Sequence, residues 1–279
     1  MLRWVSGCAV AVFVIAGAAA EPSIKRGDYL VNTVMTCGHC HSPFGPPAAV
    51  AGREFSGGIP FDEDAFNVTA PNITPDAETG IGRWSDADIR RLLLTGIRPD
   101  GRPVAEVMPT AFYPILTADD LNSIIAYLRS LKPVKNKVPD PVYKVAVPHR
   151  LFPGAERSLD EADLIDKTTR GRYLATIGLC LDCHTPSRDP DGADQRASLG
   201  KGGREFPGPW GVAVSKNITS DRVAGLGDWS DDEIKTAITR GKHRDGTAFK
   251  GPMAYWSYAR MTDADIDAVV AFLRTLPPK

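Results

Sequence analysis

The chain carries two copies of one motif, Cys37-Gly38-His39-Cys40-His41 and Cys180-Leu181-Asp182-Cys183-His184, and these two stretches decide its fold. Both have the pattern Cys-x-x-Cys-His. Apart from Cys8, near the N-terminus, they contain every cysteine in the sequence. A cysteine pair that is followed directly by histidine is the signature of covalent haem attachment.

The spacing within the motif explains this chemistry. Two thiols separated by two residues can reach the two vinyl groups of one haem, and the next histidine then offers its imidazole to the iron. One motif alone could instead be a zinc-binding or redox-active cysteine pair. Two motifs that each end in histidine, each after a predicted helix, favour haem. We therefore predict two covalently bound haem c groups, attached through Cys37, Cys40, Cys180 and Cys183, with His41 and His184 as the fifth iron ligands.

The motifs belong to an internal repeat. Asn72-Ile73-Thr74 recurs 145 residues later as Asn217-Ile218-Thr219, and Trp84-Ser85 recurs at the same offset as Trp229-Ser230. Upstream segments repeat at slightly different offsets, as loop insertions produce. We expect two domains with the same layout.

The residue pattern of each repeat predicts three helices. The first leads into the motif, over about residues 24–36 and 169–179. A middle helix begins at Ser85 or Ser230 and a last helix at Thr117 or Thr262, each with an acidic residue three positions later. Apolar residues at helical spacing predict one buried stripe on each last helix: Leu121, Ile124, Ile125, Leu128 and Leu131, then Ile266, Val269, Val270, Leu273 and Leu276.

The predicted fold is all-α, with two tandem helical domains joined by a proline-rich linker. The expected ranges are 1–20 for a signal peptide, 21–131 for the first domain, 132–167 for the linker and 168–279 for the second domain. The linker is expected to be an extended segment that wraps the surface.

Met108 and Met253 are the predicted sixth iron ligands. Met108 lies 67 residues after His41, and Met253 lies 69 residues after His184, at matching places between the middle and last helices. A loop there can fold across the distal face of the ring, and a thioether sulfur favours reduced iron. The alternative role for a methionine is adaptable core packing. His243 is the rival ligand to Met253.

Haem propionates are anions that need hydrogen-bond donors, and the candidate donors must occur in both repeats. Three pairs meet that condition: Asn72 with Asn217, Arg53 with Arg204, and Trp84 with Trp229. The asparagines could instead be turn residues, and the tryptophans core residues. The other histidines, His39, His149 and His243, are expected at the surface.

The N-terminus is typical of a secretory signal peptide: Arg3 precedes an apolar run over 4–15 and small residues over 18–20. An uncleaved anchor is the alternative. No later stretch approaches the length of a membrane span, so we expect a mature periplasmic chain without a transmembrane segment, free to associate peripherally with a membrane. The net charge of −1 argues against nucleic acid as a partner.

From about Ile24 to its end, the sequence resembles the dihaem and trihaem cytochrome c subunits of periplasmic and membrane-bound dehydrogenases, such as alcohol and gluconate dehydrogenases. The resemblance rests on the two motifs, on Pro71–Asp76 with Thr79–Ser85, and on Met108-Pro109. It implies class I cytochrome c domains with His/Met haems that receive electrons from a catalytic subunit. Those subunits commonly carry three haem motifs and this chain has two, so the identity of the dehydrogenase does not follow.

The sequence therefore predicts an electron-transfer protein and not an enzyme. It would carry single electrons from a periplasmic dehydrogenase to an oxidase, another cytochrome or a similar respiratory acceptor. The alternative is a dihaem oxidoreductase of the peroxidase or thiosulfate type, which needs an open or displaceable sixth position on iron. A gas-binding cytochrome would need a five-coordinate iron.

Overall fold

A computed structural model describes residues 21–43, 50–147, 151–186 and 195–279. The predicted signal peptide and His149 lie outside these ranges.

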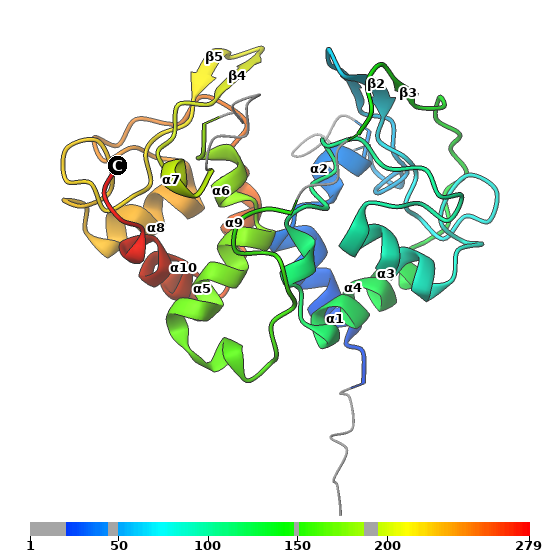
Figure 1. The fold of residues 1–279 in the computed structure, drawn as a ribbon, viewed down its shortest axis with the longest axis horizontal. Helices are drawn as coiled ribbons and strands as arrows, with labels where there is room; N and C mark the ends of the chain where they lie inside the picture. The colour runs from blue at the N-terminus through cyan, green and yellow to red at the C-terminus, as the bar shows by residue number, and fades with distance from the viewer. Residues whose placement is uncertain (1–20, 44–49, 148–150, 187–194) are drawn as a thin grey trace, which may run out of the picture.

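The chain forms two lobes that lie side by side and contain the same arrangement of helices below a small sheet (Figure 1). The first lobe contains α1 (Ile24–Tyr29), the π-helical turn η1 (Leu30–Val34), α2 (Gly38–His41), α3 (Asp86–Thr95), the 3-10 turn η2 (Tyr113–Ile115) and α4 (Ala118–Ser130). The second contains α5 (Lys167–Ile177), α6 (Cys180–Cys183), α7 (Gln195–Ser198), α8 (Asp231–Arg240), α9 (Tyr255–Tyr258) and α10 (Asp263–Thr275), preceded by the 3-10 turn η3 (Asp163–Ile165).

The predicted starts of the middle and last helices are confirmed. The Ser85 and Ser230 side chains cap α3 and α8 in complete capping boxes, in which the acidic side chain three residues later accepts the N–H of the capping serine. Thr117 and Thr262 cap α4 and α10 by accepting a backbone N–H in the same way. These contacts satisfy backbone donors that the helix itself leaves unpaired.

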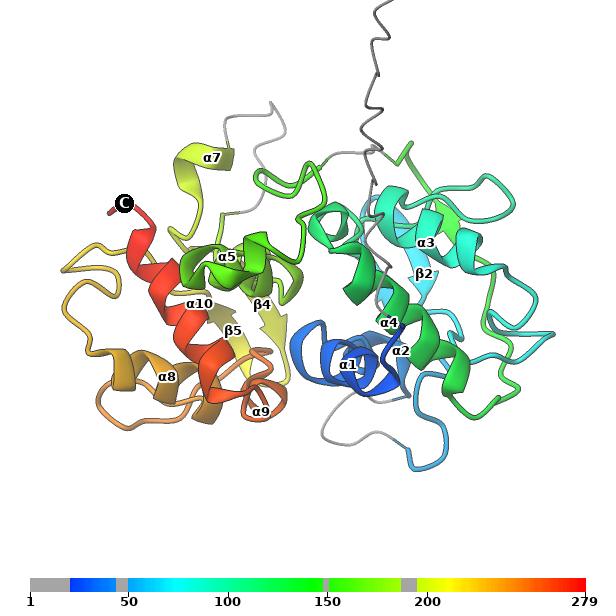
Figure 2. The same ribbon diagram turned by 90° about the horizontal axis from the view of Figure 1, so that it is seen from below.

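The first and last helices of each lobe cross at a glycine. Figure 2 shows α1 against α4 and α5 against α10. A Cβ atom on Gly27 would lie 2.0 Å from the Ser123 carbonyl oxygen, and one on Gly171 would lie 1.8 Å from the Ala268 carbonyl oxygen. Because no side chain fits at this distance, glycine is what allows the two backbones to pack directly against each other.

The all-α prediction misses two small antiparallel sheets. In the first lobe β1 (Pro60–Asp62) pairs with β2 (Phe66–Thr69), and β3 (Val142–Tyr143) adds to β2. In the second lobe β4 (Glu205–Gly208) pairs with β5 (Gly211–Val214). The strands are too short to show a clear alternating pattern in the sequence.

The segment expected to be a surface linker is partly buried. It supplies strand β3 and then buries Phe152, Ala155 and Leu159, which are 1%, 0% and 4% exposed. The Phe152 ring stacks on Phe112 of the first lobe at a centroid distance of 4.1 Å. This part of the chain therefore contributes to the core, and the prediction that all of it wraps the surface is wrong.

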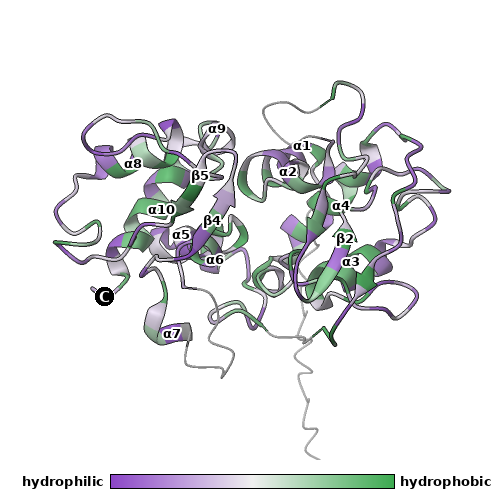
Figure 3. Cartoon of the chain, turned by 90° about the horizontal axis from the view of Figure 1, so that it is seen from above, coloured by the Kyte–Doolittle hydropathy of each residue, from purple (hydrophilic) through white to green (hydrophobic). Residues whose placement is uncertain are grey.

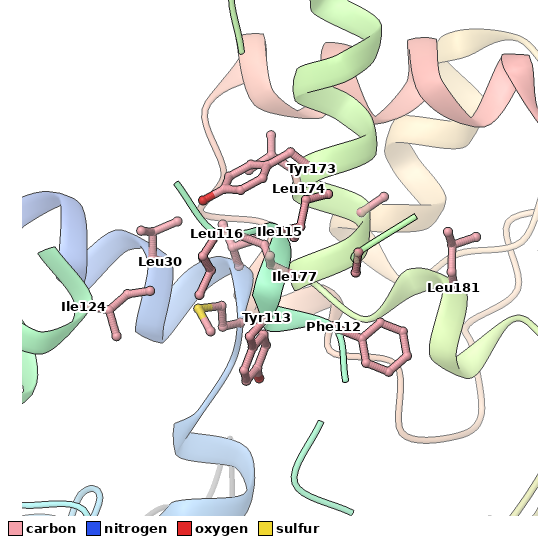
Figure 4. Packing of buried hydrophobic residues seen from close by; sticks show 14 of the residues in the cluster. Leu30, Phe112, Tyr113, Ile115, Leu116, Ile124, Tyr173, Leu174, Ile177 and Leu181 are labelled. Atoms are coloured by element: carbon pink, nitrogen blue, oxygen red, sulfur yellow. The ribbon is translucent and has the colours of Figure 1, made fainter. Parts of the chain in front are cut away.

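One hydrophobic core extends through both lobes. Figure 4 shows Leu30, Ile115, Leu116 and Ile124 of the first lobe near Tyr173, Leu174 and Ile177 of the second. The predicted stripes on α4 and α10 are buried in this core, whereas the outer loops are largely hydrophilic (Figure 3). Since the two domains share a core, burial of apolar surface holds them together. Within the described ranges, no helix combines the length and the apolar character that a membrane span requires.

Two buried carboxylates connect the lobes reciprocally. Asp120 of α4 accepts two hydrogen bonds of 2.7 Å from Arg26 of its own lobe and one of 2.6 Å from the Tyr173 hydroxyl of the other. Asp265 of α10 accepts 2.6 Å hydrogen bonds from Arg170 of its own lobe and from the Tyr29 hydroxyl of the other. Burial and the neighbouring Asp265 raise the pKa of Tyr29 to about 12, so its hydroxyl remains a donor at neutral pH.

We expect Tyr173→Phe to destabilise the protein by about 1.5–3 kcal/mol, because a hydrogen bond to a buried charged group is lost. The measurement is the free energy of unfolding in guanidinium chloride, followed by circular dichroism. Tyr255→Phe is the control, because the Tyr255 hydroxyl has no hydrogen-bond partner among the described residues and its loss should change stability by less than about 0.5 kcal/mol. Equal unfolding midpoints for Tyr173→Phe and the wild type would contradict the cross-lobe role of Tyr173.

Candidate cofactor sites in the two domains

Each motif begins at a sharp turn after the first helix of its domain. The residues just before the first cysteine, Thr36 and Leu179, have φ values of +52° and +61°. This left-handed conformation is uncommon for residues other than glycine, and rarer still for a β-branched residue such as threonine. It turns the chain into the short helices α2 and α6, which carry the thiols and lead to the histidine.

The motif histidines are oriented by backbone carbonyls. The His41 Nδ1 lies 2.8 Å from the Pro71 carbonyl oxygen, and the His184 Nδ1 lies 2.7 Å from that of Lys216. A carbonyl oxygen can only accept, so Nδ1 must carry the proton and the lone pair of each neutral imidazole is on Nε2. Burial lowers the pKa of both histidines, which favours this neutral form. Both rings are therefore prepared to bind a metal through Nε2, with the outer hydrogen bond that metal-binding histidines usually make.

A glycine in each domain holds the segment that supplies this carbonyl. The Gly57 N–H donates to the His41 carbonyl oxygen, and the Gly202 N–H donates to that of His184, both at 2.7 Å. The φ values of the two glycines are +78° and +75°. A Cβ on Gly57 would lie 2.4 Å from the Ala70 carbonyl oxygen, next to the residue that accepts from the His41 ring. A side chain here would push that acceptor away from the imidazole.

The four motif cysteines are free thiols in the protein chain alone. Burial raises the pKa of Cys37 and Cys183 to about 12 and that of Cys180 to about 11, and also raises that of Cys40. Thiol redox chemistry requires the thiolate, which this burial disfavours. Across the described residues, no three His, Cys, Asp or Glu side chains gather into a group that could hold a metal ion. The geometry therefore does not support the zinc alternative.

The loops that carry Met108 and Met253 share backbone contacts at equivalent positions. Met108 and Met253 each accept a hydrogen bond at the carbonyl oxygen from the N–H two residues later, at 2.7 and 2.9 Å. Each loop also contains an isolated antiparallel bridge, Ile97 with Pro103 and Lys242 with Ala248, at equivalent positions. Both methionines are half-buried, and Met108 packs against the core. The repeat has thus preserved these contacts together with the methionine.

The asparagines proposed as propionate donors have another role. The Asn72 side-chain oxygen accepts from the N–H and the hydroxyl of Thr74, and its nitrogen donates to the Thr79 hydroxyl and the Val134 carbonyl. Both N–H donors of Asn72 are therefore used within the protein. Asn217 repeats the contacts to Thr219 and donates to the backbone of Lys279. These contacts match the turn alternative for both asparagines, and the propionate role of Asn72 and Asn217 stays a prediction.

The arginine pair of proposed donors differs between the domains, whereas the tryptophan pair does not. Arg53 is exposed and donates to the Asn136 side chain at 2.8 Å. Arg204 is half-buried and forms an ion pair of 3.0 Å with Asp182 inside the second motif. Trp84 and Trp229 are alike, because both are half-buried against the core. The indole N–H of each has no hydrogen-bond partner among the described residues. The tryptophan pair therefore remains the better candidate.

Sequence reasoning missed two further repeated pairs. The Arg129 guanidinium donates to the carbonyls of Ile81 and Trp84, and Arg274 repeats both contacts at Leu226 and Trp229. Tyr113 and Tyr258 lie near the thiols of their own motifs; burial and those thiols raise the pKa of both hydroxyls well above the usual value. Both pairs recur at the 145-residue offset, and that signal could have identified them.

Two of the histidines expected at the surface are half-buried instead. His39 contacts the second domain, where its ring lies on Trp256. His243 packs edge-on against Phe249 at a centroid distance of 4.6 Å. The prediction of a surface position is therefore wrong for His39, because its side chain crosses to the neighbouring domain.

The residues present fit a c-type haem. Each motif combines two half-buried thiols with an imidazole whose Nε2 lone pair is free, and each repeat adds a half-buried methionine at an equivalent position. This donor set contains neutral nitrogen and sulfur and no carboxylate, which suits iron in a porphyrin better than a bare divalent cation.

Comparison with known proteins gives matching results. The cytochrome c family matches residues 24–132 and again 169–277. The cytochrome c subunit of the quinone-dependent alcohol dehydrogenase of Gluconobacter oxydans is 29% identical to this chain in an alignment 279 positions long. The alignment covers 93% of this chain and 56% of that subunit. The fructose dehydrogenase cytochrome subunit of Gluconobacter japonicus is 32% identical over 276 residues, which cover 94% of this chain and 54% of that subunit.

A shorter relative covers more of its own length. A dihaem cytochrome c-type protein of Cereibacter sphaeroides is 30% identical over 254 residues, which cover 86% of this chain and 82% of the relative. In contrast, the chain spans about half the length of the dehydrogenase subunits that it matches. Taken with the two equivalent sites, these matches show that the chain belongs to the cytochrome c family of electron-transfer proteins, with two covalently bound haem c groups.

Proposed function

We propose that this protein carries single electrons in the periplasm, from a dehydrogenase to a respiratory acceptor, without catalysing a reaction on a substrate itself. The observation that carries the proposal is the duplication of one complete site in two domains that share a core. Two equivalent redox sites held at a fixed separation suit a relay of electrons. Catalysis at haem would instead need an open distal pocket with acid–base groups.

Within this proposal, the motif residues have distinct roles. Cys37 and Cys40 hold the first haem through thioethers and Cys180 and Cys183 hold the second, with His41 and His184 as fifth ligands and Met108 and Met253 as sixth ligands. When bound, each haem iron supplies a centre that gains or loses one electron. The carbonyls of Pro71 and Lys216 keep each imidazole neutral and fix its orientation, so the ligand does not need to rearrange when the charge on the iron changes.

The proposed donor is a dehydrogenase subunit. Relatives of this chain are named as cytochrome subunits of alcohol, fructose and gluconate dehydrogenases, and all three align with more than 90% of it. A transient association with the donor would need only a modest interface. Membrane association, where it occurs, would then come from the partner or from the first 20 residues.

The direct test is purification of the tagged full-length protein from its native host. We expect a dehydrogenase to co-purify, and its substrate to reduce both haems of the complex. The oxidised protein should also show a methionine-to-iron charge-transfer band for each haem. Rapid binding of carbon monoxide by the reduced protein, or turnover of hydrogen peroxide by the isolated protein, would instead support a catalytic or gas-binding haem.

Removal of one attachment cysteine tests the stoichiometry. We expect Cys180→Ala, matured in a host that exports and attaches haem, to retain one stably bound haem where the wild type has two. The reason is that the second site loses one of its two thioether bonds while the first site is unchanged. The haem-to-protein ratio from a pyridine haemochrome spectrum measures this, and two intact haems would contradict the assignment.

Replacement of the sixth ligand tests the role of Met108. We expect Met108→His to lower one of the two reduction potentials substantially, because imidazole does not favour reduced iron as a thioether does. A spectroelectrochemical titration should show one shifted and one unshifted potential. Met35→Leu is the control, since Met35 is 2% exposed in the core and has no proposed iron role. Two potentials that stay unchanged in Met108→His would exclude Met108 as a ligand.

A further inference from the structure

His39 of the first motif contacts helix α9, which follows Met253 in the second domain. Its imidazole stacks on the Trp256 indole, with ring centroids 5.3 Å apart and an angle of 24° between the planes. Its Nε2 lies 3.2 Å from the Ser257 hydroxyl oxygen. Trp256 belongs to α9, three residues after Met253, and Figure 2 shows α9 beside α1 of the first domain.

A hollow of about 330 Å³ flanks this stack. Asn32, Thr36 and Gly38 line it from the first domain, and Trp256, Ser257 and Arg260 line it from the second. The Arg260 guanidinium closes one side by donating to the Asn32 carbonyl. Beside this hollow, the two stacked rings connect the first motif with α9.

The contact is not a consequence of the duplication. The positions equivalent to His39 and Trp256 in the other domain are Asp182 and Ala111. Asp182 forms its ion pair with Arg204 of its own domain, at 3.0 Å. A pair of conjugated rings therefore crosses the interface in one direction only, from the attachment motif of the first site to the distal side of the second.

We propose that His39 and Trp256 form the path by which an electron passes between the two haem sites. The inference rests on the proposed function, in which both sites carry electrons. His39 is bonded to Cys40, whose thioether would join the first haem, and Trp256 is joined through Tyr255 and Ala254 to Met253. One electron leaves the reduced iron of one site and is gained by the oxidised iron of the other, and no bond or proton changes. Tunnelling decays more slowly through packed conjugated rings than across an empty gap.

Substitution of the tryptophan, with a matched aromatic control, tests the path. Trp256→Leu removes the ring, whereas Trp256→Phe keeps an aromatic ring at the same place. His39→Ala removes the other half of the stack and provides a second variant should Trp256→Leu fold poorly. The readout is the rate of electron exchange between the haems within one molecule, from the line widths of the haem methyl NMR signals in half-reduced protein. Both reduction potentials are measured in parallel.

We expect a several-fold loss of the exchange rate in Trp256→Leu and in His39→Ala, a smaller loss in Trp256→Phe, and unchanged potentials in all three. Exchange at the wild-type rate in Trp256→Leu or His39→Ala would overturn the path and leave the proposed function intact. Absence of exchange in the wild type would instead overturn the relay between the sites, and the path with it.

Discussion

The arrangement of the two domains depends on two buried carboxylates. Asp120 and Asp265 are 4% and 1% exposed, and a buried charge is costly unless it is paired and hydrogen-bonded. Each is stabilised by an arginine of its own domain and by a tyrosine of the other. Each carboxylate accepts one hydrogen bond from a tyrosine of the other domain. Separation of the domains would therefore remove one hydrogen-bond donor from each buried carboxylate. The relative orientation of the two haem sites follows from this reciprocal contact and from the common core.

Comparison of the two domains separates the residues that serve each site from those that serve the pair. The parts that repeat are local to a site: the carbonyl that accepts from the imidazole, the bridge in the methionine loop, and the arginine of the last helix that holds the tryptophan loop. The parts that differ lie between the domains or at the edges. Strand β3 covers β2 in the first domain, whereas β5 pairs only with β4 among the described residues. The two sites therefore share one set of donor residues in different surroundings.

This division has a consequence for electron transfer. A site whose histidine is fixed at both its backbone and its ring needs little rearrangement when the iron changes charge, and the same fixation occurs in both domains. A preferred direction of electron transfer must then come from features that differ between the two domains. His39 and Asp182 occupy equivalent positions of the two motifs, but His39 stacks on Trp256 of the other domain, whereas Asp182 pairs with Arg204 of its own. The duplicated protein thus combines two equal centres with an unequal interface.

The sequence by itself determined the features that depend on residues close together in the chain. Local patterns correctly predicted features that depend on spacings within a few turns of the chain. These are the Cys-x-x-Cys-His motifs, the helix caps at Ser85, Thr117, Ser230 and Thr262, and the apolar stripes on α4 and α10. Folding of the whole chain was needed to establish the addition of β3 to β2, the burial of Phe152, the hydrogen bond from Asn72 to Val134, and the crossing of His39 to the second domain. Each of these contacts joins residues that are distant in the chain, and only the folded backbone brings them within hydrogen-bonding or packing distance.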